Sequence, residues 1–123
     1  VAAFNAKDVD AIMAAYGPEE ALFVFDVIPP LQYNGVRMYR KTYEDFLALF
    51  PGEFHVSISD LDITVSASGD VAYGHSLQHV KGVRKNGKKT DGILRVTNGY
   101  RKVNGQWLIA QEHNSIPPTR GLN

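Results

Sequence analysis

The chain has 123 residues, a length typical of one domain built around one hydrophobic core. It contains no cysteine, which excludes disulfide bonds and thiolate metal sites. Its 13 basic and 13 acidic residues balance, and no apolar run approaches the roughly 20 residues that span a bilayer. We therefore expect a single domain over residues 1–123 that has neither a nucleic-acid nor a membrane partner.

The N-terminal part has the pattern of helices. The chain opens on Val1 rather than Met, and we expect residues 1–5 to be the last turn of a truncated first helix. The expected location is the cytoplasm, and a cleaved signal peptide stays open as an alternative. Asp8 is a favourable N-cap for a second helix. The apolar residues of that helix follow the i, i+3, i+4, i+7 spacing at Val9, Ile12, Met13 and Tyr16.

A short β run and a third helix follow. The run Ala21–Phe25 ends at Asp26, just before two prolines. Asn34-Gly35 begins the third helix, and Pro51-Gly52 ends it. An aromatic stripe on one face of this helix consists of Tyr39, Tyr43, Phe46 and Phe50.

After Gly52 the apolar period changes from 3.6 to 2, which predicts strands. The apolar parity flips near Ser59-Asp60, which predicts a β-bulge and a bend in the sheet. Hairpin turns are expected at Asn86-Gly87 and Asn104-Gly105. The later strands are expected over residues 71–81, 92–103 and 106–115. Helices followed by a meander of strands indicate an α+β fold with the helices on one face of the sheet.

The order of these motifs resembles the NTF2-like superfamily, and within it SnoaL-like and ketosteroid-isomerase-like proteins. The resemblance rests on Asn5–Ile12, on the β run that ends at Asp26 and on Gly35 before the third helix. It rests also on Gly105–Ile109 followed by His113-Asn114-Ser115. It implies a cone-shaped, cystatin-like fold. In that fold a strongly curved mixed or antiparallel sheet packs against three N-terminal helices and encloses a pocket. The family resemblance also implies a homodimer through the outer face of the sheet.

The resemblance to ketosteroid isomerases also implies a site. It places Asp26 near their general base and Asn98 at an oxyanion donor, with His75 as a third candidate catalytic residue on the concave face. A carboxylate in an apolar cup suits proton abstraction. The residues expected to bind the ligand are Tyr16, Phe23, Phe25, Tyr39, Tyr43, Phe46, Tyr73, Glu112 and Asn114.

Strand parity leaves open which face of each strand lines the pocket. Asp26 is alternatively a solvated turn residue, and His75 is alternatively a structural histidine. Glu112 is expected to bond His75 or a tyrosine hydroxyl if it faces inward, and to be a rim residue otherwise. The basic residues of the hairpin tip, Arg84 among them, are expected to be solvated. No metal site is expected, because His75 and His79 match no ligand spacing.

Two functions are therefore expected as alternatives. The first is binding of a small, apolar organic molecule, with a cofactor-independent isomerase, cyclase or dehydratase activity that begins with proton abstraction beside a carbonyl. The second is a non-catalytic association domain that drives oligomerisation. The segment Gly105–Pro118 favours it, because it also resembles the association domain of calmodulin-dependent kinase II.

Overall fold

The computed structural model of the chain describes residues 1–118. The helices are α1 (Ala2–Asn5), α2 (Val9–Met13) and α3 (Val36–Leu47). The strands are β1 (Phe23–Phe25), β2 (Tyr33–Asn34), β3 (Phe54–Val65), β4 (Val71–Val83), β5 (Lys89–Val103) and β6 (Gln106–Ser115). No helix in the described part of the chain has the length and apolar character to cross a bilayer.

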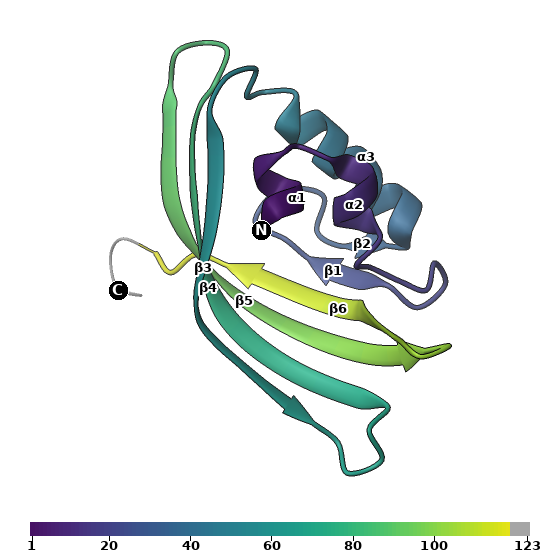
Figure 1. Cartoon of the computed structure of the whole chain (residues 1–123). Coiled ribbons are helices and arrows are strands. Elements are labelled where there is room, and N and C mark those ends of the chain that lie inside the picture. Colours follow the sequence, from purple (N-terminus) through teal and green to yellow (C-terminus); the bar gives the residue numbers. More distant parts are fainter. Residues whose placement is uncertain (119–123) are drawn as a thin grey trace.

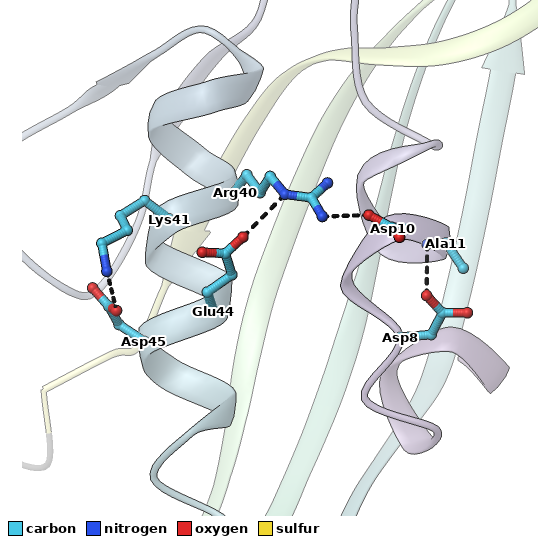
Figure 2. Close-up of polar contacts among 7 residues, drawn as sticks. All are labelled: Asp8, Asp10, Ala11, Arg40, Lys41, Glu44 and Asp45. Atoms are coloured by element: carbon cyan, nitrogen blue, oxygen red, sulfur yellow. Dashed lines mark hydrogen bonds and ion pairs between the residues drawn. The ribbon is translucent and has the colours of Figure 1, made fainter.

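Both longer helices are capped. Asp8 accepts a hydrogen bond from the backbone N–H of Ala11 over 3.1 Å, as its position before α2 predicted (Figure 2). The first two N–H groups of α3 donate to the carboxylate of Glu19. Gly35 precedes α3 with a φ of +91°, and a Cβ at this position would lie 2.7 Å from Glu19. Glycine therefore suits both the backbone conformation and the close carboxylate.

The six strands form one mixed sheet in the order β2-β1-β6-β5-β4-β3. Neighbouring strands are antiparallel except β1 and β6, which run parallel. The predicted bulge in β3 is confirmed, because its register against β4 shifts between Ser59 and Asp62. The sheet bends near its middle, and the three helices lie inside the bend (Figure 1). The predicted α+β fold with a strongly curved sheet is thereby confirmed.

The two long hairpins differ in loop length, and this sets which residues share a face. Asn104 and Gly105 form a two-residue turn with positive φ at both positions, as their sequence predicted. The β4–β5 loop has three residues, because Arg84 N–H donates to the carbonyl of Lys88 over 2.8 Å. A two-residue turn at Asn86-Gly87 would pair Asn98 with His75. The three-residue loop pairs Asn98 with Gly74 instead.

The core lies between the helices and the concave face of the sheet. Val24 of β1 and Phe50 after α3 are completely buried, and Tyr33 and Tyr39 are nearly so. Tyr39, Tyr43 and Tyr16 pack with ring centroids 4.9–6.3 Å apart. This tyrosine cluster places three hydroxyl groups close together inside the domain.

Candidate functional site

A cavity of about 250 Å³ lies inside the bend of the sheet. Helix α3, the segment after β1 and the concave faces of β3, β4, β5 and β6 supply its walls. Much of the wall is apolar, with Phe4, Tyr43, Phe46, Phe54, Val80 and Leu94 among its residues. The polar side chains on the wall include Asp26, Gln78, Arg84, Thr90 and Asn114.

Asp26 is the carboxylate on this wall. It directly follows β1, and α3 packs beside it, so that the hydroxyl of Tyr39 lies 2.8 Å from Asp26 Oδ2. The backbone N–H of Val27 donates to Asp26 Oδ1 over 2.7 Å. The carboxylate is therefore held in place while it stays partly exposed toward the cavity.

A second carboxylate, Glu112, lies behind the wall and is only 4% exposed. Its Oε1 accepts from Tyr16 over 2.9 Å and from Asn98 over 3.0 Å. Its Oε2 lies 2.9 Å from the Tyr39 hydroxyl oxygen and accepts from Asn114 over 3.1 Å. Asn98 is the direct cross-strand partner of Glu112, and Asn114 lies two residues after Glu112 on β6. Both amides are therefore on the same face of the sheet as the Glu112 carboxylate.

Burial dominates the electrostatics of this cluster. It raises the pKa of Glu112, and the four hydrogen-bond donors only partly oppose it. Burial, followed by the neighbouring acidic groups, also raises the pKa values of Tyr16 and Tyr39 well above that of an ordinary phenol. The tyrosine hydroxyls therefore keep their protons across the physiological pH range.

Asn114 connects the buried cluster to the cavity. Its Nδ2 donates to Glu112, and its side chain forms part of the cavity wall. Its Oδ1 is buried and has no hydrogen-bond partner in the described part of the protein. An unpaired buried acceptor costs about 1–3 kcal/mol, so a donor that reaches it gains a favourable interaction.

A family profile described as the SnoaL-like domain matches residues 1–119. The chain belongs to the SnoaL-like domain family. No curated protein matches it. An NTF2-like protein of unknown function from Pseudomonas putida KT2440 is 28% identical, with a TM-score of 0.80 over 94% of this chain and 78% of that one.

Two more solved structures share the fold at lower identity. An NTF2-like superfamily protein from Salmonella enterica serovar Typhimurium LT2 is 18% identical, with a TM-score of 0.82 over 98% of this chain and 85% of that one. A ketosteroid isomerase-like protein from Erwinia carotovora atroseptica SCRI1043 is 22% identical, with a TM-score of 0.74 over 95% and 88%. At these identities the similarity establishes an NTF2-like fold.

Several predicted residues meet at the cavity of this SnoaL-like domain. Asp26, Tyr39, Tyr43, Phe46 and Asn114 all lie on its wall. They come from the segment after β1, from one face of α3 and from β6. The aromatic stripe and the alternation along β6 were the sequence signals for this part of the site.

Tyr16, Asn98 and Glu112 lie one layer deeper. None of the three is part of the cavity wall. The predicted role of Asn98 as an oxyanion donor does not fit this arrangement, because Asn98 is 9% exposed, lies outside the cavity wall and directs one N–H of its Nδ2 to Glu112. Glu112 does bond tyrosine hydroxyls, which was one of the two partners expected for it.

The predicted inward positions of His75 and Tyr73 are wrong. The His75 side chain is 65% exposed and Tyr73 is 63% exposed. The three-residue loop between β4 and β5 explains why both side chains point outward. It pairs Asn98 with Gly74, so even-numbered β4 residues share the concave face with Asn98 and odd-numbered β4 residues lie on the convex face. His75 is therefore outside the candidate site.

Phe23 and Phe25 were also predicted to line the pocket, and this is wrong as well. Strand β1 pairs with β6 so that Val24 lies beside Glu112, while Phe25 lies beside His113. The ring centroids of Phe25 and His113 are 5.3 Å apart on the opposite face of the sheet. The apolar cup around Asp26 is thus built by α3 and β3 rather than by β1.

Sequence reasoning missed the polar residues on the far wall. Gln78, Arg84 and Thr90 come from the β4–β5 hairpin, which the bend of the sheet brings over the cavity. Arg84 Nε donates to the Thr90 hydroxyl over 3.1 Å. The basic residues of the hairpin tip are exposed, as their composition predicted, and the alternation of residues gave no signal that one of them, Arg84, also borders the cavity.

Proposed function

We propose that this domain binds a small, largely apolar carbonyl compound and that Asp26 removes a proton from the carbon beside the carbonyl. The observation that carries the proposal is the Asp26 carboxylate on a largely apolar cavity wall, with the Tyr39 hydroxyl oxygen 2.8 Å from it. A carboxylate in such surroundings is an effective general base. The similarity to a ketosteroid isomerase-like structure supports the same class of chemistry.

The reaction balances with protein groups alone. Asp26 takes the proton as the C–H bond breaks, and the electron pair of that bond moves to the carbonyl oxygen to form an enolate. Return of the proton to a different carbon completes an isomerisation. In a cyclisation the enolate carbon bonds to a second carbonyl carbon of the ligand, and the oxygen of that carbonyl takes the proton from Asp26. In a dehydration the enolate expels a hydroxyl group from the neighbouring carbon, and this group takes the proton from Asp26 and leaves as water. The site therefore fits a cofactor-independent isomerase, cyclase or lyase.

The polar residues on the wall indicate which chemical groups the ligand carries. Asn114 is on the wall and its buried Oδ1 is unpaired among the described residues, so a ligand O–H or N–H group that reaches this oxygen gains a hydrogen bond. Arg84 offers a cation at the hairpin wall, where a carbonyl or carboxylate oxygen of the ligand is stabilised. The aromatic side chains between these groups suit a ring system.

Exchange of α-protons tests the proposal. β-Tetralone, a ring ketone with acidic α-protons, is incubated with the protein in D₂O, and exchange is followed by NMR. The wild type is expected to exchange the α-protons faster than buffer, and Asp26→Asn is expected to lose about 10²-fold or more of that rate. Asp62→Asn, at an aspartate whose side chain is 74% exposed, is the matched control. Equal rates for wild type and Asp26→Asn contradict the proposal.

A second role, self-association, is favoured by exposed apolar side chains at the β3–β4 hairpin. This end of the sheet lies away from the helices (Figure 1). The exposed residues there are Leu61, Ile63, Val65, Val71 and Tyr73. Strand pairing places Ile63 and Val65 on one face of the hairpin and Val71 and Tyr73 on the other. Exposed apolar side chains often mark protein interfaces, and we propose that the sheet forms a homodimer. Sedimentation at micromolar concentration tests it: a dimer that Ile63→Lys dissociates supports it, and a monomeric wild type contradicts it.

A further inference from the structure

The hydroxyl of Tyr39 lies between two carboxylates. Its oxygen is 2.8 Å from Asp26 Oδ2 and 2.9 Å from Glu112 Oε2. Both distances are those of hydrogen bonds between oxygens. A neutral phenol has one proton and therefore donates to only one of the two carboxylates.

The second short contact also needs a proton. Two ionised carboxylates around one phenol would leave a lone pair of Tyr39 facing a carboxylate oxygen with nothing between them. We propose that Asp26 and Glu112 share one proton through Tyr39, so that the pair carries one negative charge instead of two. Like charges in a shared buried site commonly behave in this way.

The shared proton has two positions. With the proton on Glu112, Glu112 donates to Tyr39 and Tyr39 donates to Asp26. With the proton on Asp26, Asp26 donates to Tyr39 and Tyr39 donates to Glu112. Conversion between the two forms moves one proton across each hydrogen bond, so every group keeps its valence and the net charge is unchanged.

The form with the proton on Glu112 predominates when the cavity is empty. Glu112 is buried, and burial raises its pKa, whereas Asp26 is partly exposed and has the N–H of Val27 as a second donor. This form leaves Asp26 ionised and ready to accept a proton.

The other titratable groups around the unit do not supply the missing proton. Tyr16 donates to Glu112 Oε1, and Tyr43 contacts Tyr16 with 3.3 Å between the hydroxyl oxygens. Tyr100 lies on β5, where its hydroxyl contacts Asn98. The pKa values of all three phenols are raised, with burial the largest cause, so each keeps its own proton. Arg84, on the cavity wall, donates to the Thr90 hydroxyl.

The catalytic consequence rests on the proposed function. Glu112 touches no ligand, so it is a positioning residue that acts through Tyr39. By holding the shared proton it keeps the single negative charge on Asp26, where the base needs it. The sharing itself is a property of the protein alone and is measurable without a substrate.

Carboxyl-¹³C NMR titration of the full chain tests the inference. The wild type is compared with Asp26→Asn, Tyr39→Phe and the double variant, and the Glu112 carboxyl is followed in each. Loss of the Asp26 charge is expected to lower the Glu112 titration midpoint by about one pH unit or more. In the Tyr39→Phe background the effect of Asp26→Asn is expected to shrink to less than half. Asp62→Asn is the control and is expected to leave the midpoint unchanged.

Three outcomes overturn the inference. The first is a Glu112 titration midpoint that Asp26→Asn does not change. The second is a midpoint shift on Asp26→Asn that is equally large with and without the Tyr39 hydroxyl, and the third is a Glu112 carboxyl that titrates like that of an exposed glutamate. If Tyr39→Phe does not fold, the comparison of wild type with Asp26→Asn decides alone. Coupled carboxyls in a protein that exchanges no ketone protons would contradict only the proposed function. Uncoupled carboxyls in a protein that does exchange them would contradict only the shared proton.

Discussion

Asn114 Nδ2 donates to Glu112 Oε2 over 3.1 Å, and this contact orients an amide whose buried Oδ1 has no hydrogen-bond partner among residues 1–118. The reverse orientation would place the amide oxygen against the carboxylate oxygen. The buried glutamate thus determines which end of the amide is left unpaired. The buried carboxylate and the cavity wall are connected through this one side chain.

The unpaired acceptor predicts a preference for hydroxyl donors. β-Naphthol is expected to bind the wild type roughly 2- to 12-fold more tightly than its methyl ether, since one hydrogen bond contributes about 0.5–1.5 kcal/mol. Asn114→Ala is expected to remove this preference, and Asn86→Ala at the hairpin tip is expected to keep it. Titration calorimetry measures both. A preference that survives Asn114→Ala but is lost in Asp26→Asn would show that Asp26, and not Asn114, recognises the hydroxyl.

Glu112 predicts how stability changes with pH. Its pKa is raised by burial in the folded protein, so the folded state binds more protons than the unfolded state above the ordinary glutamate range. The Glu112 contribution to the free energy of unfolding is therefore full at low pH and is lost as pH rises through the raised pKa. Urea denaturation across pH is expected to show this decline in the wild type and not in Glu112→Gln. An unchanged slope in the variant would contradict the assignment.

Packing predicts a difference between two glycines of the same hairpin. A Cβ at Gly82 would lie 2.7 Å from the ring of buried Phe50, whereas a Cβ at Gly92 meets nothing within 4 Å. Gly82→Ala is expected to destabilise the fold by about 1–3 kcal/mol, because the ring must shift in a packed core. Gly92→Ala is expected to leave the free energy of unfolding nearly unchanged. Equal losses of unfolding free energy for the two variants in chemical denaturation would contradict the tight packing of Phe50 against Gly82.

Figure 2 shows two kinds of polar contact at the helices, an N-cap and ion pairs between exposed side chains, and the two are expected to differ in how much they stabilise the fold. Asp8 accepts from the first turn of α2, so Asp8→Ala is expected to cost about 0.5–2 kcal/mol. Asp45 forms an exposed i,i+4 pair with Lys41, so Asp45→Ala is expected to cost no more than about 0.5 kcal/mol. Thermal unfolding of both variants at low and moderate salt checks this, and a larger loss at Asp45 would contradict it.

Local sequence patterns were sufficient for most of the fold. The period change after Gly52, the parity flip near Ser59-Asp60 and the Asn104-Gly105 turn each depend on neighbouring residues, and the structure has the strands, bulge and turn that they predicted. The register of β6 against β5 does not follow from that turn alone, because a two-residue turn would pair Asn98 with Gln111, and a register shift between Gly99 and Tyr100 pairs it with Glu112 instead. The resemblance to ketosteroid isomerases, and not the turn, was the reason to expect Asn98 and Glu112 on one face.

The errors in the site come from longer-range geometry. One extra loop residue between β4 and β5 puts His75 on the opposite face of the sheet from the one predicted. The Asn86-Gly87 sequence predicts a turn, but it does not distinguish a two-residue loop from a three-residue loop. Phe25 was misplaced because the parallel pairing of β1 with β6 joins segments far apart in the chain. The Tyr39 hydroxyl between two carboxylates involves α3, β6 and the residue after β1, and no local pattern records such a meeting.

The most direct test of the proposed site is a crystal structure of the protein with β-naphthol. The ring is expected inside the bend of the sheet against Phe46 and Leu94, with its hydroxyl within hydrogen-bond distance of Asn114 Oδ1 or of the Asp26 carboxylate. A naphthol bound only on the convex face of the sheet, with side chains filling the space between α3 and β5, would contradict the account.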